Sequence, residues 1–145
     1  MVLFRFDLTF YGENFVPESF AATFEAQGVK VKWCSENNER ALPYLSVSPD
    51  KEFSTQLNVD NHLHWFCALL DENHLALRAG GVEKTVLFTE VFYEGGQCNM
   101  ELFNHEFYAC AHRCALDTPL SAYKLPQAEW NKLEREHRNA YAEYY

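Results

Sequence analysis

The sequence predicts an α+β fold, a two-layer sandwich in which helices pack on a largely antiparallel sheet. Two observations lead to this prediction. Short segments with apolar side chains at every second position recur along the 145 residues, and segments with helical periodicity lie between them. No internal repeat or low-complexity linker divides the chain, whose length suits one core. We therefore expect a single domain over residues 1–145 that ends in an amphipathic helix at 126–145.

The chain begins with a predicted strand and a predicted helix. In residues 2–10 every second side chain is apolar and the side chains between them are mostly polar, which is typical of a strand with one buried face. Residues 17–27 then favour a helix, because Pro17 suits a first turn and Phe24 lies one turn after another phenylalanine. Gly28 can end this helix in a left-handed conformation.

The middle of the chain predicts short strands followed by a long helix. Residues 29–34 alternate again, and residues 44–59 allow two short strands around the turn signal SPDKE. Asn58 or Asp60 can cap a helix that runs towards Gly80. One face of this helix is apolar and carries Leu63, Phe66, Cys67, Leu70 and Leu77.

The last third predicts a hairpin, two helices and one more strand. Residues 84–102 read as two alternating segments on either side of Gly95 and Gly96, which tolerate the positive φ of a tight turn. A helix from about 104 to 116 and a short strand in SAYKL follow, and Pro126 opens the final helix. One side of that helix carries Trp130, Leu133, His137, Ala140, Tyr141 and Tyr144.

Composition narrows the class of partner. The formal net charge of −9 would repel a nucleic-acid backbone and favours a basic macromolecule instead. The N-terminal residues lack the pattern of a secretory signal, and no apolar run is long enough to span a membrane. Five cysteines without regular spacing do not suggest a disulfide framework. We expect a cytoplasmic protein with reduced thiols.

The segment from Cys98 to Cys114 holds three of the cysteines, and its spacing favours core packing. Cys110 and Cys114 share a helical stripe with Phe107, and cysteine is among the most frequently buried residues. His105 and His112 lie on the opposite face of the same helix, so a metal ion could not reach both pairs. The sequence therefore predicts no metal site.

No motif in the chain indicates catalysis. There is no nucleophile elbow, Walker loop, dinucleotide-binding glycine pattern or HExxH, so we predict neither an enzyme nor a cofactor. Cys34 or Cys98 beside a histidine brought close by the fold stays open as a nucleophile. The main alternative is an enzyme or small-ligand binder with a polar pocket around Gln97 and Asn99. A self-assembling module that uses the C-terminal AYAEYY is a further alternative.

Carboxylates between the long helix and the predicted hairpin suggest an interaction surface. They are predicted to form an acidic rim, and an exposed tryptophan of the long helix is a candidate anchor for a partner. The residues are Asp71, Glu72, Glu83, Glu90, Glu94, Glu101 and Trp65.

Several segments together resemble an uncharacterised bacterial family, domain of unknown function 4279. The stretch HLHWFCALL corresponds to a family helix of the type H-L-x-W-x-x-x-L-L, and a strand of the type V-x-Y-x-x-x-x-G-Q-x-N follows it. The opening FRFDLTFYGENF is similar to the family's first strand and helix. The corresponding residues include His62, Leu63, Trp65, Leu69, Leu70, Phe92, Gly96, Gln97, Asn99, Ser121 and Tyr123, whereas Tyr108, Cys110 and Cys114 replace the family's leucines.

The resemblance implies a fold and no activity. Small acidic cytoplasmic proteins of this general kind look like immunity proteins of bacterial toxin systems. Toxins that act on nucleic acid carry cationic clefts, which an acidic partner complements. We therefore expect a protein that binds and neutralises a cognate basic toxin domain, of the nuclease type, without binding nucleic acid or membranes itself.

Overall fold

The computed structural model describes residues 2–35, 42–96 and 100–140 and confirms the α+β prediction. Its centre is the strand β1, Val2–Tyr11, which pairs antiparallel over its whole length with β5, Lys84–Tyr93. The side chains of β1 alternate as the sequence predicts. Phe4, Phe6 and Leu8 are fully buried on one face, because that face carries the core.

Five shorter strands complete the sheet along the described residues. On its second edge β1 pairs antiparallel with two of them, β3 and β4, and β2 extends the sheet from β3. On its second edge β5 pairs with β6 and β7, and these are the parallel pairs. The bounds are β2 Lys30–Ser35, β3 Tyr44–Ser48, β4 Phe53–Thr55, β6 Leu116–Asp117 and β7 Leu120–Lys124.

Helices α1, Pro17–Ala26, and α2, Val59–Ala79, cover the core face of the sheet. Phe24 of α1 stacks on Phe10 with 5.9 Å between ring centroids. Phe66 of α2 meets Phe6 edge to face at 5.7 Å. Gly28 ends α1 with φ of 78°, as its position predicts.

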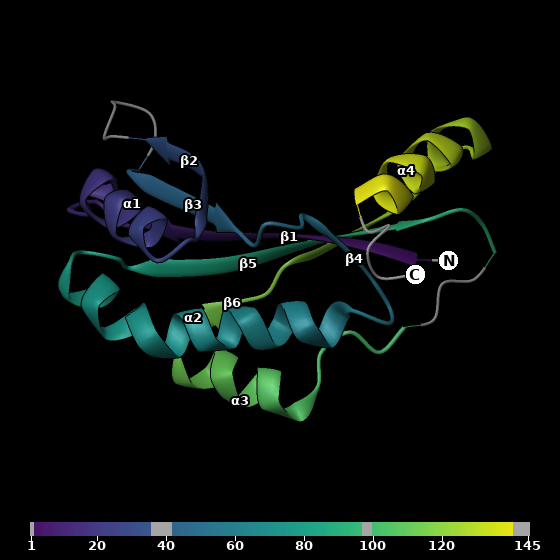
Figure 1. Ribbon diagram of the computed structural model, residues 1–145. Coiled ribbons are helices and arrows are strands. Elements are labelled where there is room, and N and C mark those ends of the chain that lie inside the picture. Colours follow the sequence, from purple (N-terminus) through teal and green to yellow (C-terminus); the bar gives the residue numbers. More distant parts are fainter. Residues whose placement is uncertain (1, 36–41, 97–99, 141–145) are drawn as a thin grey trace.

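Helix α3, His105–Arg113, packs on the outside of α2 and contacts the sheet chiefly at β6. In Figure 1 the two helices lie below the long strands β1 and β5, with α3 outermost. Asn104 caps α3, since its side-chain oxygen accepts a hydrogen bond from the Phe107 amide at 2.9 Å. The chain therefore places two neighbouring helices between the sheet and solvent.

The opposite face of the sheet is polar and is partly covered by α4, Gln127–Ala140, above the strands in Figure 1. Arg5 pairs with Glu90 there, Nε to Oε2 2.5 Å, and lies over the rings of Phe53 and Phe92. Trp130 of α4 is buried on its predicted side. Positions 141–145 of the predicted helix lie outside the described residues.

The predicted hairpin over residues 84–102 is wrong in its second half. Residues 84–93 form β5, but 100–104 are not a strand, and 97–99 lie outside the described part of the chain. The physical reason is that β5 has no free edge, because β1 occupies one side and β6 and β7 the other. Leu102 is buried in the core cluster instead and leads into α3.

Within residues 2–35, 42–96 and 100–140, no helix combines the length and the apolar character that crossing a lipid bilayer requires.

Candidate functional site

Helices α2 and α3 enclose an open groove of about 630 Å³. Its floor is apolar or sulfur-containing, and its walls carry acidic side chains, two histidines and one arginine. The lining residues are Asp60, Asn61, Leu63, His64, Cys67, Asp71, Asn104, His105, Glu106, Phe107, Cys110 and Arg113.

Two polar contacts hold α2 and α3 together on either side of this groove. Near the start of both helices, Asn104 Nδ2 donates to Asp60 Oδ1 at 3.2 Å. Near the end of α3, Arg113 makes a two-pronged contact with Asp71, Nε to Oδ1 3.0 Å and Nη2 to Oδ2 2.9 Å. The first contact joins the start of α2 to the start of α3, and the second joins a later turn of α2 to the last turn of α3. The two helices therefore run parallel. This register places matching turns of α2 and α3 face to face.

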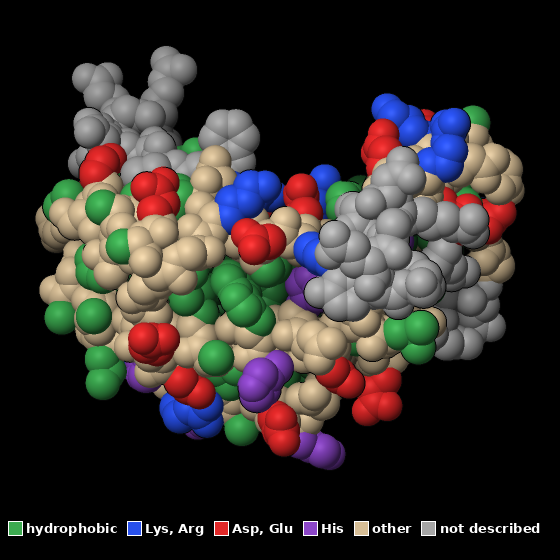
Figure 2. Space-filling model, viewed as in Figure 1, with side chains coloured by type: hydrophobic (Ala, Val, Ile, Leu, Met, Phe, Trp, Pro, Cys, Tyr) green, Lys and Arg blue, Asp and Glu red, His purple; other side chains and the backbone are tan. Residues whose placement is uncertain are grey.

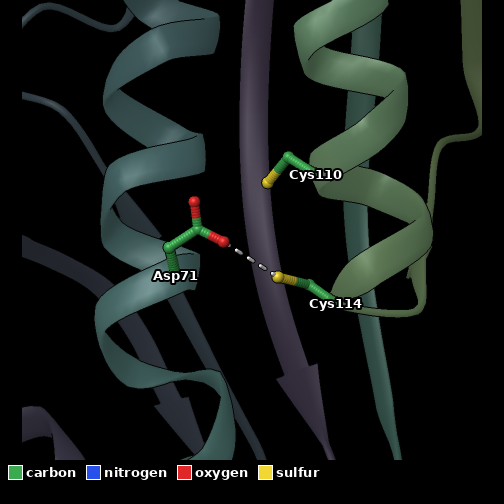
Figure 3. Close-up of side chains that lie close together, drawn as sticks. All are labelled: Asp71, Cys110 and Cys114. Carbon is green, nitrogen blue, oxygen red and sulfur yellow. Dashed lines mark hydrogen bonds between the residues drawn. The ribbon is translucent and has the colours of Figure 1, made fainter.

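Two thiols and a carboxylate meet between the two helices, and a third thiol, Cys67, lies nearby. Figure 3 shows Asp71 of α2 pointing towards α3, with Cys110 and Cys114 pointing back towards α2. Cys114 Sγ donates to Asp71 Oδ1 at 3.8 Å, and Cys110 Sγ to the Cys67 carbonyl at 4.0 Å. The Cys67 thiol lies close enough to the Cys110 thiol for each to affect the pKa of the other.

The burial predicted for the stripe is confirmed, and it keeps these thiols protonated. Cys110 is 0% and Cys114 3% exposed. Burial, followed by the neighbouring thiol, raises the pKa of both Cys110 and Cys114 to about 12. Burial also raises the pKa of Cys67. At neutral pH the cluster therefore offers weak S–H donors and no thiolate nucleophile.

In metal-free, reduced protein we expect Cys110 and Cys114 to resist alkylation. A pKa of about 12 against the ordinary 9.0 means a thiolate fraction about 1000-fold lower at pH 8. Iodoacetamide labelling followed by mass spectrometry should show both sites reacting at least that much more slowly than in guanidinium-unfolded chain. The rate should rise about tenfold per pH unit. Labelling of the folded chain as fast as of the unfolded chain would contradict the assignment.

The grouping of thiols with Asp71 is the feature that sequence reasoning missed. His105 and His112 are exposed, and His105 lines the groove without joining the thiols. The partners of the cysteines come from α2 instead. Within the described residues, the ligand atoms of Asp71, Cys110 and Cys114 all lie within 4.8 Å of one another. The spacings Cys67 to Asp71 and Cys110 to Cys114, four residues each, were the available signal.

The structure does not bring the predicted acidic rim together. Glu83 and Glu94 flank the ten-residue β5 at opposite ends, which separates them by about 36 Å of extended chain. Glu90 is half-buried on the polar face of the sheet, in the pair with Arg5. Glu101 is exposed before α3.

Asp71, Glu72 and Trp65 share α2 but do not form one site. Asp71 faces α3, whereas Glu72 and Trp65 line a shallow hollow of about 370 Å³ beside the end of α1. The indole ring of Trp65 is half-buried and packs against Phe66 at 5.0 Å between centroids. Part of its ring therefore supports the core, and part is available to a partner.

Acidic side chains gather on the helical layer formed by α1, α2 and α3. Figure 2 shows red side chains and histidines along the lower part of the molecule, over α2 and α3, with little blue among them. These three helices carry six exposed carboxylates and two guanidinium groups. The carboxylates are Glu18, Glu25, Asp60, Asp71, Glu72 and Glu106; the basic residues are Arg78 and Arg113.

The alternative pocket predicted around Gln97 and Asn99 lies outside the described residues, as does Cys98. Cys34 belongs to β2, and its side chain also lies outside them.

Fold and site together define an α+β protein with an acidic helical layer and a thiol-lined groove between two parallel helices. No family model, curated protein or solved structure matches the chain at a significant level. The family resemblance seen in the sequence stays a prediction.

Proposed function

We propose that this chain is an immunity-type protein of the bacterial cytoplasm. It binds a basic toxin domain of the nuclease type and neutralises it by covering the toxin's active surface, without catalysing a reaction. The observation that supports this proposal is the excess of exposed carboxylates on α1, α2 and α3. One of the two basic residues on these helices, Arg113, is already paired with Asp71.

Charge complementarity supplies the physical reason. A domain that cleaves nucleic acid needs a cationic cleft, and an acidic surface attracts such a cleft before contact. This attraction raises the association rate. Once bound, the acidic surface also covers the cationic groups of the toxin that would hold the phosphates of the substrate. By contrast, α4 carries three acidic and three basic residues and has no such excess.

Affinity requires apolar anchors in addition to charge, because exposed ion pairs contribute little by themselves. The helical layer offers such anchors. Tyr108 of α3 is 57% exposed and Leu75 of α2 is 73% exposed. Trp65 adds a partly accessible indole beside Glu72. An accessible aromatic side chain beside a carboxylate, as Trp65 beside Glu72, is suited to a basic protein partner.

The test is association with purified basic nuclease-type toxin domains, including any that a gene adjacent to this one encodes. We expect the two purified proteins to bind one to one, and association to slow as salt screens the charges. The double variant Glu25→Lys/Glu72→Lys should associate at least about tenfold more slowly at low ionic strength. Surface plasmon resonance at several salt concentrations measures this rate.

A matched control reverses two carboxylates on α4, Glu129→Lys and Glu136→Lys, which changes the net charge equally. This control should associate nearly as fast as the unmodified chain, because α4 lies on the other side of the sheet. If the association rate fell equally in both double variants, net charge alone would explain the effect, and α1 and α2 would not be the binding surface. The proposal would be wrong if the two proteins did not bind and this chain did not rescue cells that express the toxin domain.

A second candidate is small-ligand binding in the α2–α3 groove. Its volume of about 630 Å³ lies within the range of ligand sites. A metabolite library screened by thermal shift separates the two functions, because a ligand bound only by the folded state raises the melting temperature.

A further inference from the structure

The spacing of the thiol cluster arises from two parallel helices in matched register. Side chains four residues apart lie on one face of a helix. Cys67 and Asp71 therefore project from α2 on one side, and Cys110 and Cys114 from α3 on the other. The contacts of the Cys110 thiol with the Cys67 carbonyl oxygen and of the Cys114 thiol with the Asp71 carboxylate join the two helices turn by turn. Three metal-ligating side chains, those of Asp71, Cys110 and Cys114, thus converge from two elements.

The separations suit a tetrahedral metal ion. Zinc bonds of about 2.3 Å to sulfur and about 2.0 Å to oxygen require ligand atoms about 3.5 to 3.8 Å apart. Cys114 Sγ and Asp71 Oδ1 are 3.8 Å apart, and no pair among Asp71, Cys110 and Cys114 exceeds 4.8 Å. A contraction of about 1 Å or less would bring these three ligand atoms to coordination distance. Side-chain rotation can supply a shift of that size without moving either helix.

The donor set selects the kind of cation. Thiolates are soft ligands that favour zinc and related metals, and hard cations such as Ca²⁺ and Mg²⁺ prefer oxygen. A coordinating metal removes the proton of its thiol ligand, so the cation itself generates the thiolates it needs. The open groove reaches Cys67, Asp71 and Cys110 and provides the path of entry.

Arg113 gives the site an outer shell. Two thiolates and one carboxylate around a divalent cation leave one excess negative charge, which the guanidinium offsets. Its two hydrogen bonds hold the Asp71 carboxylate in place. Each carboxylate oxygen keeps a further lone pair for a metal. Such outer partners orient the ligands and tune metal affinity.

We infer that Asp71, Cys110 and Cys114 form a three-ligand binding site for a thiophilic divalent cation, with Zn²⁺ the best match and a water molecule, or the Cys67 thiol after side-chain rotation, in the fourth position. The ion would join α3 to α2 and fix the groove between them. This site does not depend on the proposed toxin binding.

Titration of the reduced, chelator-treated chain with Co²⁺ tests the site. Tetrahedral cobalt bound to thiolates shows sulfur-to-metal charge-transfer absorption and intense visible d–d bands. We expect both to saturate at one equivalent and to disappear when Zn²⁺ is added. Zn²⁺ should also raise the melting temperature of the unmodified chain, because it binds the folded state.

Variants locate the site. Asp71→Asn and Cys114→Ser should each weaken cobalt binding by about 100-fold or more, and Arg113→Gln by about tenfold. The remaining cysteines supply the control, since the double variant Cys34→Ser/Cys98→Ser keeps every proposed ligand and should bind cobalt unchanged. Asp71 is an exposed residue, so Asp71→Asn decides the outcome if Cys114→Ser does not fold.

Three results would overturn the inference: no thiolate spectrum with Co²⁺, unchanged binding in Asp71→Asn, or loss of binding in the Cys34 and Cys98 control. All use the purified chain alone. A failure here therefore leaves the toxin-binding test unaffected, and a failure there leaves this site standing.

Discussion

Replacing Gly12 with alanine is expected to lower the free energy of unfolding by about 3 kcal/mol or more. A Cβ at Gly12 would lie 1.9 Å from the carbonyl oxygen of Gly81 and 2.9 Å from its carbonyl carbon. Both are backbone atoms, so rotation of a side chain cannot relieve the clash. Urea denaturation followed by circular dichroism measures the change.

The cost at Gly12 is high because Gly81 cannot move away easily. It has φ of 100°, a conformation that glycine tolerates, and its own Cβ position is filled by the backbone of Asn14. The next backbone contact, from the Glu83 amide to the Tyr11 carbonyl at 2.8 Å, anchors the start of β5 to the end of β1. An alanine at Gly12 would therefore separate the loop after β1 from the loop after α2.

Gly95→Ala is the matched control. Among the described residues its Cβ would meet only the flexible end of Lys124 at 3.9 Å, and no positive φ constrains it. We expect a change within about 0.5 kcal/mol. If Gly12→Ala proved as mild as Gly95→Ala, the close approach of Gly12 and Gly81 would be refuted.

Replacing Phe66 with alanine is expected to cost about 3 to 5 kcal/mol. The ring is fully buried and meets Phe6 of β1 edge to face, so its removal leaves a cavity between α2 and the sheet. The indole of Trp65 packs on it from the other side. The same urea experiment should show a lower midpoint with a nearly unchanged slope.

Leu75→Ala on the same helix is the control for Phe66→Ala. Leu75 is 73% exposed, and alanine favours a helix at least as well as leucine does. We therefore expect almost no change in stability. A cost at Phe66 below about 1 kcal/mol would contradict its place in the centre of the core.

Most elements of the fold were predictable because local patterns decide them. The alternation in β1 follows directly from one buried sheet face, and the predicted helices α1, α2, α3 and α4 appear within a few residues of their expected bounds. Pro17 and Gly28 mark the ends of α1 as predicted. In each case the signal lies within the element itself.

The hairpin prediction was wrong because local patterns do not show which edge of a strand is already paired. An alternating segment after Gly96 reads as a strand, but β5 is already paired on both sides. The segment uses Leu102 to enter the core beside α3 instead. The two-residue strand β6 was too short to leave a pattern.

The residues of the predicted acidic rim do not come together for a related reason, since neighbours in the chain need not be neighbours in space. An extended strand carries Glu83 and Glu94 to opposite ends of the sheet. The pleat turns Glu90 to the face that lacks α2. The carboxylates that do share a layer come from three separate helices.

By itself the sequence determined the class of fold, the buried face of the first strand and the burial of Cys110 and Cys114. Periodicity of 2 or 3.6 residues is enough to decide which side chains face a core. Only the tertiary structure decided that α3 packs parallel on α2, and so that Asp71 and Cys67 meet those cysteines. Such contacts depend on the register between two helices separated by the whole of β5, which no local pattern encodes.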